Sequence, residues 1–222
     1  MSSPPPLKAP TLSDREAEPR STRKRRAIVE AGTTLFLRNG YRGTSMDEIA
    51  ALAGVSKQTV YKAFSDKESL FSDIVTSAVD QAADPVHADV VKVADTGDIE
   101  ADLRRVARQL LRRVMQPRIL QLRRLVIGEA GRFPKLGRVF YEQGPERTIA
   151  ALATVFERLA ARGALELDDP LLAAAHFNWL VMSIPLNRAM FLGEDEPPAS
   201  VELNRYADAG VRAFLAAYGR KV

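Results

Sequence analysis

A short stretch near residue 60 carries side chains whose types and spacing could read a nucleic acid. Val60 and Phe64 are spaced i and i+4, so on a helix they would share one buried side. The rest of that helix would carry donors, acceptors and cations, namely Lys57, Gln58, Thr59, Tyr61 and Lys62. Glutamine can bond adenine twice, lysine can reach guanine, and tyrosine or lysine can hold phosphates. The pattern indicates a DNA-binding surface, and an ordinary solvated helix is the plainer alternative.

Two short helices would position this surface. An apolar stripe at i, i+3, i+4 and i+7 predicts the first helix, and it consists of Met46, Ile49, Ala50 and Ala53. Ser45 and Glu48 fit a capping box at its start, and Gly54 suits the left-handed residue that ends it. Ser56 is a good N-cap for the second helix, which runs to about Phe64. Two helices joined by so tight a turn form a helix-turn-helix arrangement.

The same stretch closely resembles the signature of the TetR/AcrR family of transcriptional regulators. The matching residues, in order, are Gly40, Tyr41, Thr44, Ile49, Ala50, Ala53, Gly54, Val55, Ser56, Tyr61, Phe64, Lys67, Glu68 and Leu70. The resemblance implies an all-helical dimer whose first three helices bind DNA. It also implies that a larger helical domain binds a small effector and makes the dimer contact. Lys67 resembles the family's phosphate-contacting lysine, and a plain surface lysine is the alternative.

Ten residues on or beside the two short helices are the predicted DNA contacts: Arg42, Thr44, Ser45, Ser56, Lys57, Gln58, Thr59, Tyr61, Lys62 and Lys67. Thr44 and Ser45 are included because backbone N–H groups at a helix start can bind a phosphate, although capping alone would also explain them. A basic cluster lies upstream, at Arg20, Arg23, Lys24, Arg25 and Arg26. It could follow phosphates or enter a minor groove, or it could be a solvated run.

The chain divides into three parts. Residues 1–21 are rich in proline and end in basic residues, which predicts a disordered tail. Residues 22–66 would form the helix-turn-helix DNA-binding domain, and residues 67–222 the effector-binding and dimerisation domain. Helical periodicity dominates, so we predict an all-α protein of about nine to ten helices, with a three-helix N-terminal domain and a C-terminal helical bundle. A connector is expected over residues 84–98 and a helix break at Gly144–Pro145.

The second part of the chain is similar to the C-terminal domain of the AefR-like branch of the same family. The runs LVIGEAGRFPKLGRVFYEQGPER and DPLLAAAHFNWL carry this resemblance, and that branch is often met as repressors near efflux genes. The last two helices, opening at Asp169 and near Ser200, would pair with a twofold mate. Candidate effector contacts are Phe133, Phe140, Phe156, Phe177, Asn178, Trp179, Met182 and Met190. For each of them, plain core packing is the alternative.

Composition and motifs exclude several classes of chemistry. The chain has no cysteine, which rules out disulfides, thiolate zinc sites and a cysteine nucleophile. Neither of the two histidines, His87 and His176, belongs to a metal-binding pattern, and no nucleotide-binding or hydrolase motif occurs. We therefore expect no catalytic residue, no metal, no cofactor and no enzymatic activity. Without a signal-peptide pattern or a long apolar run, a cytoplasmic protein that does not bind membranes is expected.

These expectations combine into one functional hypothesis. The chain would be a homodimeric, ligand-responsive regulator, in the first instance a repressor, that binds palindromic double-stranded operator DNA and is released by a small-molecule effector. Control of efflux genes is the extension that the AefR-like resemblance implies. One rival is an architectural DNA-binding protein without an inducible pocket. Another is a helical enzyme in which the helix-turn-helix plays no part. The net charge of +4 permits DNA binding but does not argue for it.

Overall fold

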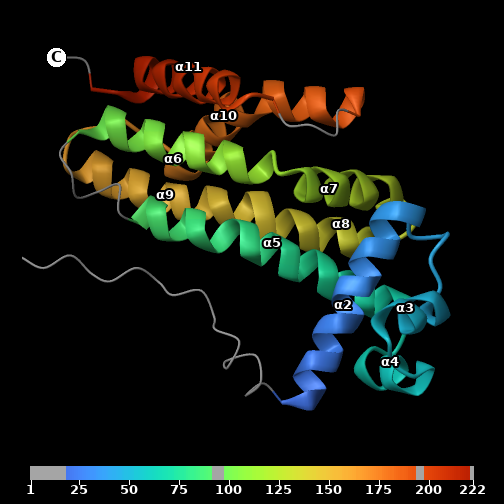
Figure 1. Ribbon diagram of the computed structural model, residues 1–222. Helices are drawn as coiled ribbons and strands as arrows, with labels where there is room; N and C mark the ends of the chain where they lie inside the picture. The colour runs from blue at the N-terminus through green and yellow to red at the C-terminus, as the bar shows by residue number, and fades with distance from the viewer. Residues whose placement is uncertain (1–18, 92–97, 194–197, 221–222) are drawn as a thin grey trace, which may run out of the picture. The chain divides into compact units, whose positions relative to one another are not determined.

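The computed structural model describes residues 19–91, 98–193 and 198–220, which form helices joined by short connections (Figure 1). This confirms the all-α prediction. Most of the predicted tail lies outside the described residues, and Arg20 and Ser21 at its end already belong to the first described helix. None of the described helices is long and apolar enough to cross a membrane.

The chain packs as two compact units that divide between Ile74 and Val75. The division falls inside helix α5 (Lys67–Val91), so the first two turns of α5 pack with unit 1, which ends at Ile74, and the rest belongs to unit 2. Helix α5 also continues past residue 84, where a connector was expected. The assignment of DNA binding and effector binding to separate domains stays a prediction.

Unit 1 is built around a small aromatic core. Its helices are α2 (Arg20–Asn39), α3 (Met46–Ala53), α4 (Lys57–Ala63) and the start of α5. The rings of Phe36, Tyr41 and Phe71 lie 5.0–5.6 Å apart between centroids. A Cβ on Gly32 would come within 3.2 Å of the Leu70 side chain, so α2 and α5 approach closely at this glycine. This packing holds α2 and the start of α5 together within unit 1, the unit that also contains the two short helices.

Unit 2 is a helical bundle with its own aromatic core. Its elements after α5 are α6 (Ile99–Val114), α7 (Pro117–Glu129), α8 (Pro134–Tyr141), η2 (Glu142–Glu146), α9 (Arg147–Ala161), α10 (Pro170–Leu192) and α11 (Ser200–Tyr218). Phe156, Phe177 and Phe214, one each from α9, α10 and α11, have ring centroids 4.9–5.6 Å apart. These contacts hold the last three helices together.

The predicted helix break at Gly144–Pro145 is wrong. The chain instead runs from α8 to α9 through one π-helical turn, η2, with Pro145 buried inside it. Proline has no backbone N–H, so it cannot make the ordinary helical hydrogen bond, and a widened turn absorbs this defect without ending the helix. The hydroxyl of Thr148 donates to the Gly144 carbonyl at 3.0 Å and gives that carbonyl a partner.

Candidate nucleic-acid interface

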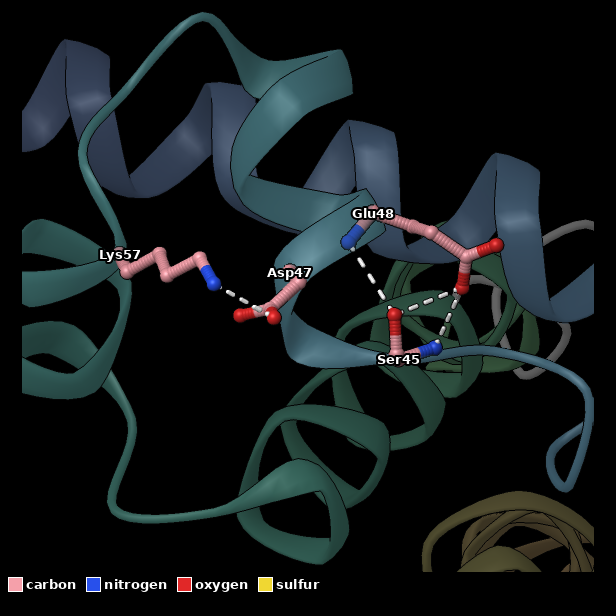
Figure 2. Close-up of polar contacts among 4 residues, drawn as sticks. All are labelled: Ser45, Asp47, Glu48 and Lys57. Atoms are coloured by element: carbon pink, nitrogen blue, oxygen red, sulfur yellow. Dashed lines mark hydrogen bonds and ion pairs between the residues drawn. The ribbon is translucent and has the colours of Figure 1, made fainter.

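The start of α3 is fixed by the predicted capping box (Figure 2). The Ser45 hydroxyl accepts a bond from the Glu48 N–H at 3.2 Å. The Glu48 carboxylate in turn accepts bonds from the Ser45 N–H and hydroxyl, both at 2.8 Å. These bonds to Ser45 hold the pKa of Glu48 below its ordinary value. Helix α3 ends at Gly54, whose φ of 64° is the left-handed conformation expected there.

Helix α4 presents the predicted polar surface to solvent. Ser56 caps the helix by accepting a bond from the Thr59 N–H at 3.2 Å. Val60 is fully buried and Phe64 nearly so, as their spacing predicted. Three side chains that could read bases or hold phosphates, Lys57, Gln58 and Lys62, are exposed, and Tyr61 is 53% exposed. The chemistry expected of this surface is therefore available to a partner.

Lys57 has an acidic partner within the same unit. Its ammonium lies 2.6 Å from the Asp47 carboxylate, which projects from the first turn of α3 toward the start of α4 (Figure 2). Both side chains are more than half exposed. Water screens such a pair, so a phosphate or a guanine could take the lysine from Asp47 at small cost.

A basic groove of about 490 Å³ lies between the start of α2 and helix α4. Its charged lining residues are all cations, Arg20, Lys24, Arg25 and Lys62, and Thr59 reaches it from α4. The Arg25 guanidinium is anchored 4.3 Å above the Phe64 ring and 2.6 Å from the Asp73 carboxylate. The cations that line this groove could bind successive phosphates of a DNA backbone beside α4. The sequence indicated the upstream basic cluster, but it did not show that these residues line one groove together with Lys62.

Unit 2 contains a small cavity, which we call the α7 cavity. It has a volume of about 50 Å³ and is lined by apolar groups from α5 to α10, among them Val79, Leu110, Phe140 and Met182. Its polar lining is Arg113, Arg123 and Thr148. The π-helical turn η2 contributes Gly144 and Pro145. An apolar enclosure with a few polar groups is typical of small-molecule sites, although its volume is far below the roughly 300 Å³ of an occupied one.

Two family models match the chain, and together they cover most of it. Residues 28–74 match the model described as bacterial regulatory proteins of the tetR family. Residues 101–220 match the C-terminal domain of AefR-like transcriptional repressors. The chain belongs to the TetR family of transcriptional regulators. The helix-turn-helix and the basic groove lie within or next to the first match, and most of the α7 cavity lies within the second.

Solved structures of TetR-family regulators share the whole fold. A TetR-family regulator from Mesorhizobium loti is 45% identical, with 91% of this chain and 100% of that chain covered and a TM-score of 0.85. The flavonoid-responsive regulator FrrA is 33% identical, with 90% and 100% covered and a TM-score of 0.68. Curated relatives match over shorter stretches: YhgD of Bacillus subtilis is 44% identical over 54 residues, 24% of this chain and 28% of that protein. The chain thus matches well under two thirds of such relatives' length.

Besides Ser56, Lys57 and Thr59, three more of the predicted DNA contacts of this TetR-family chain have partners inside unit 1. Thr44 is only 2% exposed, and its hydroxyl donates to the Gly40 carbonyl at 2.9 Å. Ser45 is engaged with Glu48 in the capping box through both its N–H and its hydroxyl. The Lys67 ammonium donates to the Tyr41 and Thr44 carbonyls at 2.8 Å each. These bonds give the three residues a structural role, and their contact with DNA stays a prediction, as it does for exposed Arg42.

The predicted effector contacts are scattered through unit 2. Phe140 and Met182 are the two that line the α7 cavity. Phe156 and Phe177 belong to the aromatic core, and Met190 packs against it. The remaining three are Phe133 at the start of α8, exposed Trp179 and fully buried Asn178. Sequence reasoning missed Arg123, because neither the position nor the burial of a cation can be read from helical spacing alone.

Proposed function

We propose that this TetR-family chain is a homodimeric repressor that binds a near-palindromic operator through α4 and is released by a small molecule bound in the α7 cavity. The observation that carries the proposal is the exposed polar surface of α4, held rigidly by capped helices beside the basic groove. In this proposal Gln58 and Lys57 read base edges in the major groove. Tyr61, Lys62 and the cations of α2 hold phosphates.

An unpartnered apolar face on α10 supports the dimer. Leu172, Leu180 and Ile184 are each between 43% and 56% exposed, and they recur at helical spacing together with Trp179. Monomeric soluble proteins rarely leave such a run open to water. A twofold dimer would also place two α4 surfaces at the half-site spacing of about 34–36 Å that successive major grooves require.

The effector response is proposed to work by population shift. The α7 cavity is too small for a ligand as it stands, so a ligand must favour a conformer in which the cavity is wider. Val79 lines the cavity from α5, the helix whose first turns belong to unit 1, which offers a route from ligand to DNA-binding helices. Reversing the population from 1:99 to 99:1 requires about 5.5 kcal/mol of differential affinity.

The relatives suggest the kind of effector and of regulated genes. FrrA is described as flavonoid-responsive, so a small aromatic compound is our proposed effector class. Efflux genes are our proposed target, because the chain resembles the AefR-like branch and matches its C-terminal domain model over residues 101–220. Because the proposed operator is chromosomal DNA, the protein is proposed to act in the cytoplasm.

Genomic footprinting of the purified full-length protein tests the proposal. We expect a small number of near-palindromic sites, and release of the protein from them by an aromatic effector. Protection spread evenly over the genome would contradict operator binding. Specific binding that no compound in a broad aromatic panel releases would instead favour a ligand-independent DNA-binding protein.

A further inference from the structure

The α7 cavity contains a guanidinium that has no counter-charge among the residues that the structure describes. Arg123 projects from α7 into the lining, and its Nε atom is buried without a hydrogen-bond partner. The Phe140 ring lies 5.1 Å from its Cζ atom. None of the described lining residues is a carboxylate, and the second charged one, Arg113, is also a cation. The cavity therefore combines an apolar wall with positive charge alone.

The energetics of this site are unfavourable without a partner. Burial lowers the pKa of the Arg123 guanidinium, and no negative group in the described part of the chain acts on it in the opposite direction. A buried donor left without a hydrogen bond costs stability, and the cost is larger for a charged group. The Phe140 ring offsets only part of it, because a cation–π contact is weaker than a bond to an anion.

Four other half-buried arginines of unit 2 each pair with a carboxylate. The pairs are Arg104 with Glu100, Arg105 with Asp102, Arg108 with Asp208, and Arg147 with Asp80. Each of these guanidinium groups lies on a helix surface and has a carboxylate of its own. Arg123 differs in facing a cavity, so the natural place for its missing partner is inside that cavity.

We propose that the α7 cavity binds an apolar organic anion whose carboxylate or phenolate oxygen lies against Arg123. This proposal rests on the proposed function only in taking the α7 cavity as the effector site. The apolar walls take the hydrocarbon part of the ligand and the guanidinium takes the charged oxygen. Arg113 adds positive potential without being required to touch the ligand.

The lining can widen at identifiable places. Met182 is an unbranched side chain with several rotatable bonds, so it can move aside at little cost. The π-helical turn η2 lines another side, and such turns lack the regular hydrogen-bond ladder that stiffens an α-helix. A ligand of two fused rings would need these groups to move aside, because the cavity of about 50 Å³ is smaller than such a ligand.

The test compares 2-naphthoate with the isosteric but neutral 2-naphthamide, using calorimetry on the full-length protein. Wild type should bind the acid about tenfold or more tightly than the amide. Arg123→Met should abolish that preference and leave the amide's affinity unchanged. Arg123→Lys should keep part of the preference, because it keeps a positive charge. Arg118→Met is the matched control, since this exposed arginine of the same helix lies outside the lining.

The proposal is overturned if Arg123→Met keeps the wild-type preference, or if wild type shows no preference. Absence of acid binding at about 1 mM also counts against it. Operator binding by the same variants separates this inference from the proposed function. Loss of the acid preference without any effect of the acid on DNA binding would support the anion site and contradict effector release. If a neutral compound released DNA equally from wild type and from Arg123→Met, that result would support effector release and contradict the anion site.

Discussion

Asp47 determines what the first cation of the recognition surface can do. Its carboxylate holds the Lys57 ammonium at 2.6 Å and also brings a negative charge to the surface proposed to meet DNA. Asp47→Asn should therefore raise the affinity for all DNA sequences about two- to fivefold, since repulsion from phosphates disappears and the lysine is released. Fluorescence anisotropy over a series of salt concentrations measures this, and the salt dependence should steepen by about one phosphate contact.

Weaker DNA binding by Asp47→Asn would show instead that Asp47 is needed to orient Lys57. Glu100→Gln is the control for the loss of one negative charge, because Glu100 lies on α6 in unit 2 and pairs with Arg104. It should leave both the affinity and the salt dependence unchanged.

Burial at the candidate site could be predicted from the sequence, but the partners of its long side chains could not. Val60 and Phe64 face inward because their spacing dictates it, and the polar arc of α4 faces out for the same reason. Lys67, by contrast, bonds carbonyls 23 and 26 residues away. Such contacts depend on how helices cross, which local periodicity does not determine. A resemblance that implied a phosphate contact for Lys67 gave no sign of its bonds to the turn before α3.

Asn178 is the buried polar residue whose role can be tested by stability. It is fully buried on α10, and within the described ranges neither its Nδ2 nor its Oδ1 atom has a hydrogen-bond partner. Asn178→Leu should raise the free energy of unfolding by about 1–2 kcal/mol, because it removes two unsatisfied polar atoms from the core. Denaturant unfolding at a fixed protein concentration measures the change. A lower stability in the variant would mean that an internal water or a bound ligand satisfies Asn178 in the native protein.

At the scale of elements, local chemistry predicted the helix caps and turns. It did not predict where one helix continues into the next. The capping box at Ser45, the left-handed Gly54 and the cap at Ser56 were all predictable from residue type and spacing. Pro145 was expected to begin a new helix, yet the chain passes through it by way of η2. Pro145 is buried within η2, where the widened turn accommodates the missing backbone N–H without ending the helix.

The pair between α6 and α11 predicts a pH-dependent contribution to stability. Arg108 donates two bonds to Asp208, Nε to Oδ1 at 2.8 Å and Nη2 to Oδ2 at 2.6 Å. These bonds hold the pKa of Asp208 below its ordinary value of 3.8, although burial acts in the opposite direction. A carboxyl whose pKa is lower in the folded state stabilises the fold above its unfolded pKa. That contribution is lost as the pH falls through the folded pKa.

Asp208→Asn should lower the free energy of unfolding by roughly 1 kcal/mol at pH 7, a figure kept small because both side chains are partly exposed to water. The difference from wild type should shrink as the pH is lowered below 3.8. Chemical denaturation at a series of pH values measures both quantities. A difference that stays constant down to strongly acidic pH would contradict the charge-assisted bond. Glu100→Gln, which breaks a pair within α6 only, should have a smaller effect.

At the scale of the whole molecule, the exposed apolar face of α10 has to be explained. Leu180 and Ile184 are 43% and 56% exposed and lie one turn apart. Phe177 and Val181 of the same helix are fully buried in unit 2. A helix with both buried and exposed apolar residues fits a position between its own bundle and a second copy of the chain.

The double variant Leu180→Glu, Ile184→Glu places charges on that face and should convert the dimer into a folded monomer. Sedimentation velocity measures the mass, and circular dichroism checks that the helices remain. Because one subunit reaches one half-site, operator affinity should fall by a hundredfold or more, to roughly the level of binding to a single half-site. Ile127→Glu on α7, equally apolar and 61% exposed, should leave the dimer and its DNA binding intact. A double variant that stays dimeric would remove α10 from the interface, and the twofold reading of the operator would then require another contact surface.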